Sequence, residues 1–220
     1  MRVELHCHTL VSKDSLMSYD AIIRRVQERG LGALAITDHN KIDGAFELAR
    51  RAPFPVIIGE EIRTREGEII GYFLSEWIPP GLTPEETIAR IRGQGGLVNI
   101  PHPFDSLRHS VIKRDALHRI AEQVDMIEVL NARVIMQGEN RQAEQFAKQI
   151  GKVAVAGSDA HIPFEIGIAT IEIEPFTDAA SFRENLSRAT WHGHIGPVWT
   201  HVFSLGATWR KKLAGTPRQI

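Results

Sequence analysis

Short runs rich in valine, isoleucine and leucine recur along the chain, and segments with helical periodicity separate them. The runs occupy residues 2–5, 33–37, 55–59, 68–74, 96–100, 125–130, 152–157 and 168–174. Continuous apolar runs of this length are typical of buried strands in a largely parallel sheet. Their alternation with helices predicts an α/β fold.

Helix-start signals mark the segments between these runs. The clearest predicted helices cover residues 19–30, 83–93 and 139–151. Ser18 can cap the first of them. Thr83 and Glu86 have the spacing of a capping box at the start of the second, with proline at the first helical position.

The length of the chain favours a single domain. Its 220 residues can bury a large core and are normal for one α/β barrel. The sequence contains no linker-like segment and no internal repeat, so we expect one domain over residues 1–220. Residues 201–220 form its tail or a terminal helix, which we expect to pack on the barrel rather than to bind a membrane or a partner.

The composition limits which partners and which cellular compartment we expect for this protein. With 26 basic and 27 acidic residues, the formal net charge of -1 gives no field that attracts an anionic membrane, and no extended nucleic-acid surface is evident. A single cysteine excludes an internal disulfide and fits a reducing compartment. The start lacks the apolar run of a signal peptide, and no stretch has the length of a membrane span. We therefore expect a cytoplasmic protein with no membrane partner; its oligomeric state stays open.

Histidines and carboxylates follow the apolar runs. Four runs lead directly into such residues, which are Asp38 and His39, Glu60 and Glu61, His102, and Asp159 and His161. The carboxyl ends of strands in parallel α/β folds converge on one mouth, so these side chains should meet. His6 and His8 would project from one face of the first strand while Cys7 points into the core. That stretch alone also fits a surface strand that carries two histidines.

This mixture of side chains indicates metal binding. Neutral imidazoles with carboxylates suit Zn²⁺, Mn²⁺ or Fe²⁺. There are too many such residues for one four-coordinate ion. Two or three divalent ions that share a bridging carboxylate are therefore expected.

Five motifs in this order resemble the polymerase and histidinol phosphatase (PHP) family. They are HCHTLVSKDS at residues 6–15, TDHN at 37–40, GEEI at 59–62, PHP at 101–103 and GSDAH at 157–161. Together they are highly specific, and the resemblance spans roughly residues 1 to 200. It implies a distorted (β/α)₇ barrel with a trinuclear metal centre at the C-terminal mouth of the strands.

The resemblance also implies a ligand set. The first ion would take His6, His8, Glu61 and Asp159; Glu61 would bridge to a second ion that also takes His102; and the third would take Asp14, His39 and His161. Two positions depart from the pattern, since Glu68 and Asn131 stand where many members have histidine. The occupancy of the second ion therefore stays open.

Several further residues have two interpretations. Asp38 could orient a metal-bound histidine or cap a turn, and Glu60 could support its neighbour Glu61. Arg133 could meet a substrate phosphate or be solvated. His192 and His194 have metal-like spacing but are not required by the family pattern.

These features predict a metal-dependent phosphoric ester hydrolase. We expect hydrolysis of a small phosphomonoester, such as a nucleotide or histidinol phosphate, through metal-activated hydroxide. The general acid is not identified. The alternatives are a phosphodiesterase or exonuclease, an amide hydrolase at the same metals, or a metal-stabilised regulatory module without activity.

Overall fold

The structure is a computed structural model that describes residues 1–213. All eight predicted strands are present, and a short ninth strand follows them. The strands are β1 (Arg2–Glu4), β2 (Ala33–Ile36), β3 (Val56–Thr64), β4 (Gly67–Tyr72), β5 (Leu97–Ile100), β6 (Met126–Asn131), β7 (Val153–Gly157), β8 (Ala169–Glu172) and β9 (Thr190–Gly193).

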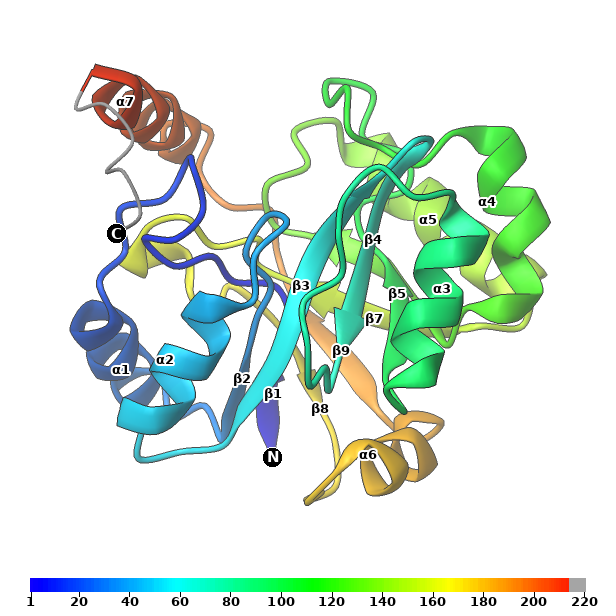
Figure 1. Cartoon of the computed structure of the whole chain (residues 1–220), viewed down its shortest axis with the longest axis horizontal. Coiled ribbons are helices and arrows are strands. Elements are labelled where there is room, and N and C mark those ends of the chain that lie inside the picture. The colour runs from blue at the N-terminus through cyan, green and yellow to red at the C-terminus, as the bar shows by residue number, and fades with distance from the viewer. Residues whose placement is uncertain (214–220) are drawn as a thin grey trace.

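The strands form one curled sheet in the order β7-β6-β5-β4-β3-β2-β1-β8-β9. The segments that follow β1 and β7 close the curl, because His8 N donates to Ala160 O at 2.9 Å and Ala160 N donates to His6 O at 3.1 Å. The result is a nearly closed barrel (Figure 1). The predicted distorted (β/α)₇ barrel is confirmed, and β4 accounts for part of its distortion because it runs antiparallel to both β3 and β5.

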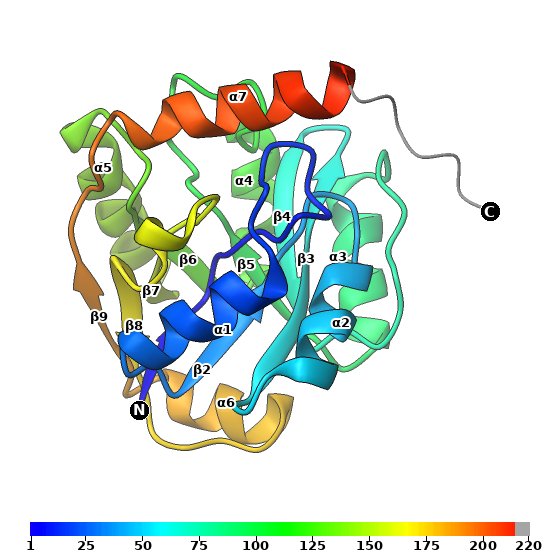
Figure 2. The same cartoon turned by 90° about the vertical axis from the view of Figure 1, so that its left-hand side faces the viewer.

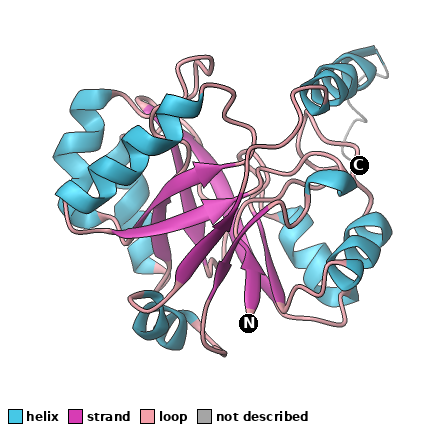
Figure 3. Cartoon of the chain, turned by 180° about the vertical axis from the view of Figure 1, so that it is seen from behind, coloured by secondary structure: helices cyan, strands magenta, loops and turns pink. Residues whose placement is uncertain are grey.

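Helices surround the sheet on two sides. They are α1 (Tyr19–Glu28), α2 (Asp43–Arg51), α3 (Pro84–Gly93), α4 (Arg114–Ile120), α5 (Gln137–Gln149), α6 (Ala179–Leu186) and α7 (Thr200–Leu213), with 3-10 turns η1 (Ala121–Gln123) and η2 (Pro163–Glu165). Helices α1 and α2 lie on one side of the sheet and α3, α4 and α5 on the other (Figures 1 and 3).

The predicted caps at Ser18 and Thr83 are confirmed, whereas the helix predicted over residues 139–151 begins two residues earlier, at Gln137. The Ser18 hydroxyl accepts from Ala21 N at the start of α1. At the start of α3, Glu86 N donates to Thr83 Oγ1 at 3.2 Å, and Thr83 N donates to Glu86 Oε2 at 2.8 Å. These caps satisfy N–H groups that no intrahelical carbonyl can reach.

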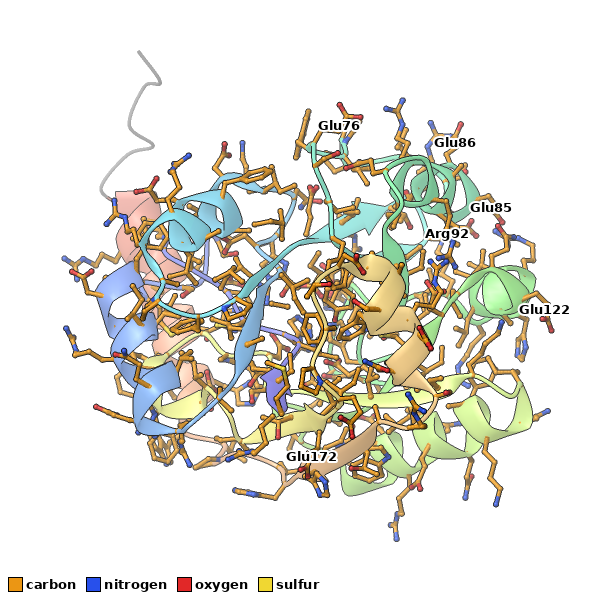
Figure 4. The ribbon with its side chains drawn as sticks, turned by 90° about the horizontal axis from the view of Figure 1, so that it is seen from below. Glu76, Glu85, Glu86, Arg92, Glu122 and Glu172 are labelled. Carbon is orange, nitrogen blue, oxygen red and sulfur yellow. The ribbon has the colours of Figure 1, made fainter. Side chains whose placement is uncertain are left out.

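Helix α6 covers the end of the barrel at which β1 begins (Figure 4). Its Phe182 and Leu186 are buried with Val3, Ala33 and Ile57 in the barrel interior. Apolar packing therefore fills this end, and the opposite end, where the parallel strands terminate, is left for polar side chains.

Helix α7 crosses that opposite end above the loop that follows β1 (Figure 2). The Lys211 ammonium donates to Leu10 O at 2.5 Å and to Ser15 O at 2.7 Å in this loop. Of the predicted terminal segment 201–220, residues 214–220 lie outside the described part. No helix within residues 1–213 is long and apolar enough to cross a membrane.

Candidate metal centre

Two histidines and two carboxylates converge where the parallel strands end. The Nε2 atoms of His6 and His8 lie 3.5 and 3.6 Å from Glu61 Oε2, and 3.5 and 3.2 Å from Asp159 Oδ1. Cys7 points the other way and is fully buried in the apolar core, as the alternation along an extended segment predicts.

Glu61 links this group to the remaining histidines. Its Oε2 atom lies 2.9 Å from His39 Nδ1, and its Oε1 atom lies 3.0 Å from His102 Nε2. On the far side of His39, Asp14 Oδ2 is 3.3 Å from His39 Nε2 and 3.4 Å from His161 Nε2. The fold therefore brings all eight expected ligands into one cluster, although they are spread from residue 6 to residue 161.

Many of the inward-facing atoms have no hydrogen-bond partner within residues 1–213, although they are buried. They include His6 Nε2, His8 Nε2, Asp14 Oδ1, Glu61 Oε2, Glu68 Oε2 and Asp159 Oδ1. Buried polar atoms without partners are costly and therefore rare in folded proteins. Several such atoms lie close together here, which indicates that they are arranged to bind a ligand rather than one another.

The spacing of these donors fits divalent metal ions. Two ligand atoms that are each about 2.1 Å from a tetrahedral ion lie about 3.4 Å apart. The distances from the two histidine Nε2 atoms to Glu61 and Asp159 run from 3.2 to 3.6 Å. Nitrogen and oxygen donors without thiolates suit transition-metal ions, so the residues present fit the metal that their chemistry predicts.

The electrostatics differ between the two histidines that follow β1. Burial opposes a charge on His6, but Asp159, Glu128 and Glu61 outweigh it and raise the pKa of His6 well above its ordinary value, so a metal ion must displace a proton from that ring. Burial, together with the imidazoles of His161 and His39, lowers the pKa of His8 to about 3, so its ring is neutral at physiological pH. Burial opposes the charge on Asp159, but Arg108 and His6 outweigh it and hold the pKa of this carboxyl well below its usual value. A neutral imidazole and an ionised carboxylate are the forms that bind a metal ion.

Glu128 supports two of the histidines. Its Oε1 atom is 2.9 Å from His6 Nδ1, and its Oε2 atom accepts from His102 N at 2.8 Å. A carboxylate on the Nδ1 side fixes the proton there, so the Nε2 lone pair of His6 faces the cluster. Asn131 donates to Glu128 at 2.9 Å and to Asp159 at 3.3 Å, so in this structure it supports the ligands through hydrogen bonds.

Asp38 supports His8 through a hydroxyl group. Ser12 Oγ donates to Asp38 Oδ1 at 2.7 Å and lies 3.2 Å from His8 Nδ1. Asp38 also accepts from Thr9 N and from the Thr9 hydroxyl at 2.7 and 2.6 Å. Asp38 therefore fixes the turn after His8 and reaches the His8 ring through Ser12.

The backbone is strained at two members of the cluster. His102 has a φ of 30° and Asp159 a φ of 53°. Positive φ is unfavourable for residues with a Cβ, and such strain persists where the surroundings fix it, commonly at functional sites. His102 follows the end of β5 and Asp159 the end of β7, both parallel to β6, so the strained turns direct their side chains into the mouth.

Family models match most of the chain. One described as the PHP domain matches residues 4–158, and one described as PHP-associated matches residues 137–190. The chain belongs to the PHP family. Together the two PHP models span all eight residues of the cluster.

Individual relatives agree with this membership. The uncharacterised protein MJ1587 of Methanocaldococcus jannaschii is 42% identical over 146 residues, which are 60% of this chain and 82% of that protein. A protein named probable phosphatase from Caldicellulosiruptor saccharolyticus is 24% identical over 199 residues, 76% of this chain and 82% of that protein. A solved two-domain protein from Bacteroides vulgatus, described as containing a PHP-like metal-dependent phosphoesterase, has a TM-score of 0.70 at 19% identity, over 94% of this chain and 69% of that chain. At this identity the structural likeness establishes the PHP fold.

Glu68 lies beside the cluster, whereas Glu60 does not. The carboxylate oxygens of Glu68 lie 3.9 Å from His39 Nδ1 and 4.0 Å from His102 Nε2. Glu60 alternates to the other face of β3, where it accepts from Ile78 N at 3.0 Å. The Glu60 side chain therefore points away from the cluster, although Glu60 is next to Glu61 in the sequence.

Arg133, His192 and His194 also lie apart from the cluster. The Arg133 guanidinium donates to both oxygens of Glu165 at 3.1 Å and to Ser204 Oγ at 2.8 Å. His192 on β9 and His194 are exposed. The structure therefore assigns Arg133 to an internal ion pair.

Sequence reasoning missed Glu128 and Arg108. A single acid within the apolar run of β6 could have marked Glu128, because an isolated buried carboxylate requires a partner. Arg108 donates to Asp159 Oδ2 and, through Nε, to Asp105 Oδ2 at 2.9 Å. It lies in a loop without periodicity, so no local signal separated it from other surface arginines.

Proposed function

We propose that the protein is a metal-dependent phosphoesterase that hydrolyses a small phosphomonoester at this cluster. The main observation behind this proposal is the group of buried, inward-facing nitrogen and oxygen atoms that have no hydrogen-bond partner among the described residues. Membership of the PHP family and the phosphatase and phosphoesterase descriptions of its relatives support the reaction class.

The PHP resemblance divides the residues into three ligand groups. His6, His8, Glu61 and Asp159 would hold one ion, Glu61 with His102 a second, and Asp14, His39 and His161 a third. When bound, such ions lower the pKa of water and neutralise charge on a phosphoryl group. Glu68 lies close enough to His39 and His102 to complete the second group in place of histidine.

Arg108 is our candidate for binding the substrate phosphate. Asp105, which is buried, holds its Nε, and its terminal nitrogen contacts Asp159 inside the cluster. The side chain is 21% exposed, so it borders both the cluster and solvent. A planar guanidinium matches phosphate oxygens in geometry and charge. Arg133 is less suited because its side chain is only 6% exposed and pairs with Glu165 rather than with a residue of the cluster.

The proposed substrate is small because the bound ions would concentrate positive charge at one point. The chain as a whole carries a net charge of -1. A polymeric nucleic acid requires a basic track along its backbone, whereas one phosphate group requires only the bound ions and Arg108.

The test is release of inorganic phosphate from a panel of phosphomonoesters. Protein stripped with a chelator and reloaded with Mn²⁺ or Zn²⁺ should release phosphate, and stripped protein should not. His6→Ala should abolish release. Glu61→Gln should reduce it far more than His109→Ala, because Glu61 contacts both histidine groups while His109 is exposed outside the cluster.

Two results would contradict the proposal. Efficient cleavage of internal phosphodiesters or amides, with no phosphate released from any monoester, would assign a different reaction to the same metals. Binding of at most one ion per chain after saturation would contradict the shared cluster.

A further inference from the structure

Helix α7 turns its small and polar residues toward the barrel. Thr200 and Ala207 are almost fully buried, at 1% and 4% exposure. Ser204, on the same side of the helix, accepts from Arg133 at 2.8 Å, and Lys211 donates to carbonyl groups of the loop that follows β1. The attachment of α7 to the barrel is therefore largely polar.

Three large apolar side chains described on this helix face solvent instead. Val202, Phe203 and Trp209 are 65%, 55% and 70% exposed. A surface helix normally buries its apolar side and exposes its polar side. Helix α7 reverses this arrangement.

The exposed apolar surface continues beyond the helix. Trp199 packs edge-on against Phe203 and at a tilt against Phe164 of η2, with ring centroids 5.7 and 5.5 Å apart. At the other end, Lys211 contacts the loop that exposes Leu10 and Leu16. We call these residues, Val202, Phe203, Trp209, Trp199, Phe164, Leu10 and Leu16, the α7 surface. Contiguous exposed apolar surfaces of this kind mark contacts with another molecule or a membrane.

Charge indicates what this surface contacts. The sequence of α7 contains no acidic residue, although the chain as a whole has a net charge of -1, and Arg210 is exposed on the helix beside the inward-facing Lys211. Lys13, in the loop beside the end of α7, adds an exposed cation. Helices that combine tryptophan and phenylalanine with lysine and arginine, and lack acids, are typical of those that lie in the plane of a membrane interface.

We propose that the α7 surface docks the protein on an anionic lipid surface. A second copy is disfavoured because two α7 helices would bring cations together without any acid on either helix. Single-stranded nucleic acid is disfavoured because the exposed cations described beside this surface, Arg210 and Lys13, do not form the basic groove that follows a nucleic-acid backbone. The composition of the whole chain predicts no membrane partner, but it cannot show that one helix turns its apolar side outward.

Docking in this way sets the orientation of the protein. Helix α7 crosses the end of the barrel that carries the metal cluster, so this end would face the bilayer with α7 between them (Figure 2). The proposal concerns location, and it does not depend on the reaction proposed above.

The test is binding of the full chain to lipid vesicles, followed by co-sedimentation and tryptophan fluorescence. Vesicles of phosphatidylcholine with phosphatidylglycerol should bind it and shift its emission to the blue, and vesicles of phosphatidylcholine alone should bind it less. Phe203→Ser with Trp209→Ser should weaken binding more than tenfold, because two buried aromatic side chains are lost. Arg210→Ser should weaken binding to the anionic vesicles about fivefold.

Trp77→Ser is the matched control, because Trp77 is 48% exposed between β4 and α3, outside the α7 surface. It should leave vesicle binding unchanged. The proposal is overturned if wild-type protein does not bind either vesicle, or if the double variant binds as well as wild type. A dimer in light scattering that the double variant dissociates would assign the surface to a second copy, and quenching by a short oligonucleotide without vesicle binding would assign it to nucleic acid.

Discussion

Glu61 joins the two halves of the cluster because its carboxylate oxygens face different histidines. One oxygen lies 3.0 Å from His102, and the other lies 2.9 Å from His39 and within 3.6 Å of His6 and His8. Its neighbour Glu60 has the same chemistry but projects from the opposite face of β3, beside Ile78 N. The period of two along a strand therefore separates a central ligand from a buried acid with no place in the cluster.

Glu60 provides a pH prediction. Burial raises the pKa of Glu60 from its ordinary 4.5 to about 8, although the Ile78 N–H opposes the shift. A carboxyl whose pKa is higher in the folded state contributes stability that is fully present below its unfolded pKa and is lost as pH rises through about 8. Metal-free wild-type protein should therefore lose stability between about pH 5 and about pH 9.

Glu60→Gln should remove the part of that loss that Glu60 contributes, since the amide does not ionise; buried Glu4, whose pKa is raised to about 7, contributes another part. Denaturant unfolding at several pH values should show the variant about 2–4 kcal/mol more stable relative to wild type at the alkaline end than at the acidic end. Glu122→Gln is the control, because the Glu122 side chain is 91% exposed. Equal pH profiles for Glu60→Gln and wild type would contradict the assignment.

At the scale of elements, the loop that follows β1 depends on the start of α2. Asp38 holds the loop through Thr9 and Ser12, and Gly44 in the first turn of α2 packs against this contact. A Cβ at Gly44 would lie 2.4 Å from Thr9 Oγ1 and only 2.1 Å from Asp38 Oδ2. The absence of a side chain at Gly44 therefore permits the arrangement that orients His8.

Gly44→Ala should weaken metal binding although alanine favours helix. Helix propensity alone would stabilise the protein by about 1 kcal/mol, but the new methyl group must displace Asp38. We expect metal affinity to fall about tenfold or more, as when a supporting hydrogen bond to a ligand is lost, and calorimetric titration with Zn²⁺ or Mn²⁺ measures it.

Gly93→Ala is the matched control, because Gly93 ends α3 and a Cβ there meets nothing within 4 Å. It should keep the metal affinity of wild type and equal or exceed its stability. Unchanged affinity in Gly44→Ala would show that the loop after β1 tolerates movement of Asp38.

At the scale of the whole molecule, the cluster ties together distant parts of the barrel. Its ligands come from the segments after β1, β2, β5 and β7 and from β3 itself. An ion that binds only the folded chain stabilises it by about 2.7 kcal/mol when its free concentration is about 100 times its Kd. Metal binding should therefore stabilise the barrel as a unit.

Removal of metal should lower the unfolding temperature by several degrees. A chain of this size shifts by about 2–4 °C for each kcal/mol of lost stability, and scanning calorimetry of stripped and reloaded protein gives the difference. His6→Ala should reduce the rise in unfolding temperature that added metal causes. His192→Ala should leave that rise unchanged, because His192 is exposed outside the cluster. An unfolding temperature that does not respond to metal would contradict tight binding at the cluster.

The sequence by itself determined the elements and the chemistry of the mouth. Apolar runs and capping residues depend on neighbours within a few positions, so all eight predicted strands and the caps at Ser18 and Thr83 could be identified locally. The positions of histidine and acid after the runs, with the PHP motifs, likewise selected the eight residues that now lie together.

The tertiary structure alone decided which residues support those eight and which way the last helix faces. Glu128 and Arg108 reach the cluster across 122 and 51 residues of chain, and Arg133 is turned away from the cluster by Glu165 and by Ser204 of α7. Such contacts depend on where separate segments meet after closure of the barrel, which no local pattern records. The outward apolar side of α7 has the same origin, because only the packed barrel shows which side of the helix it covers.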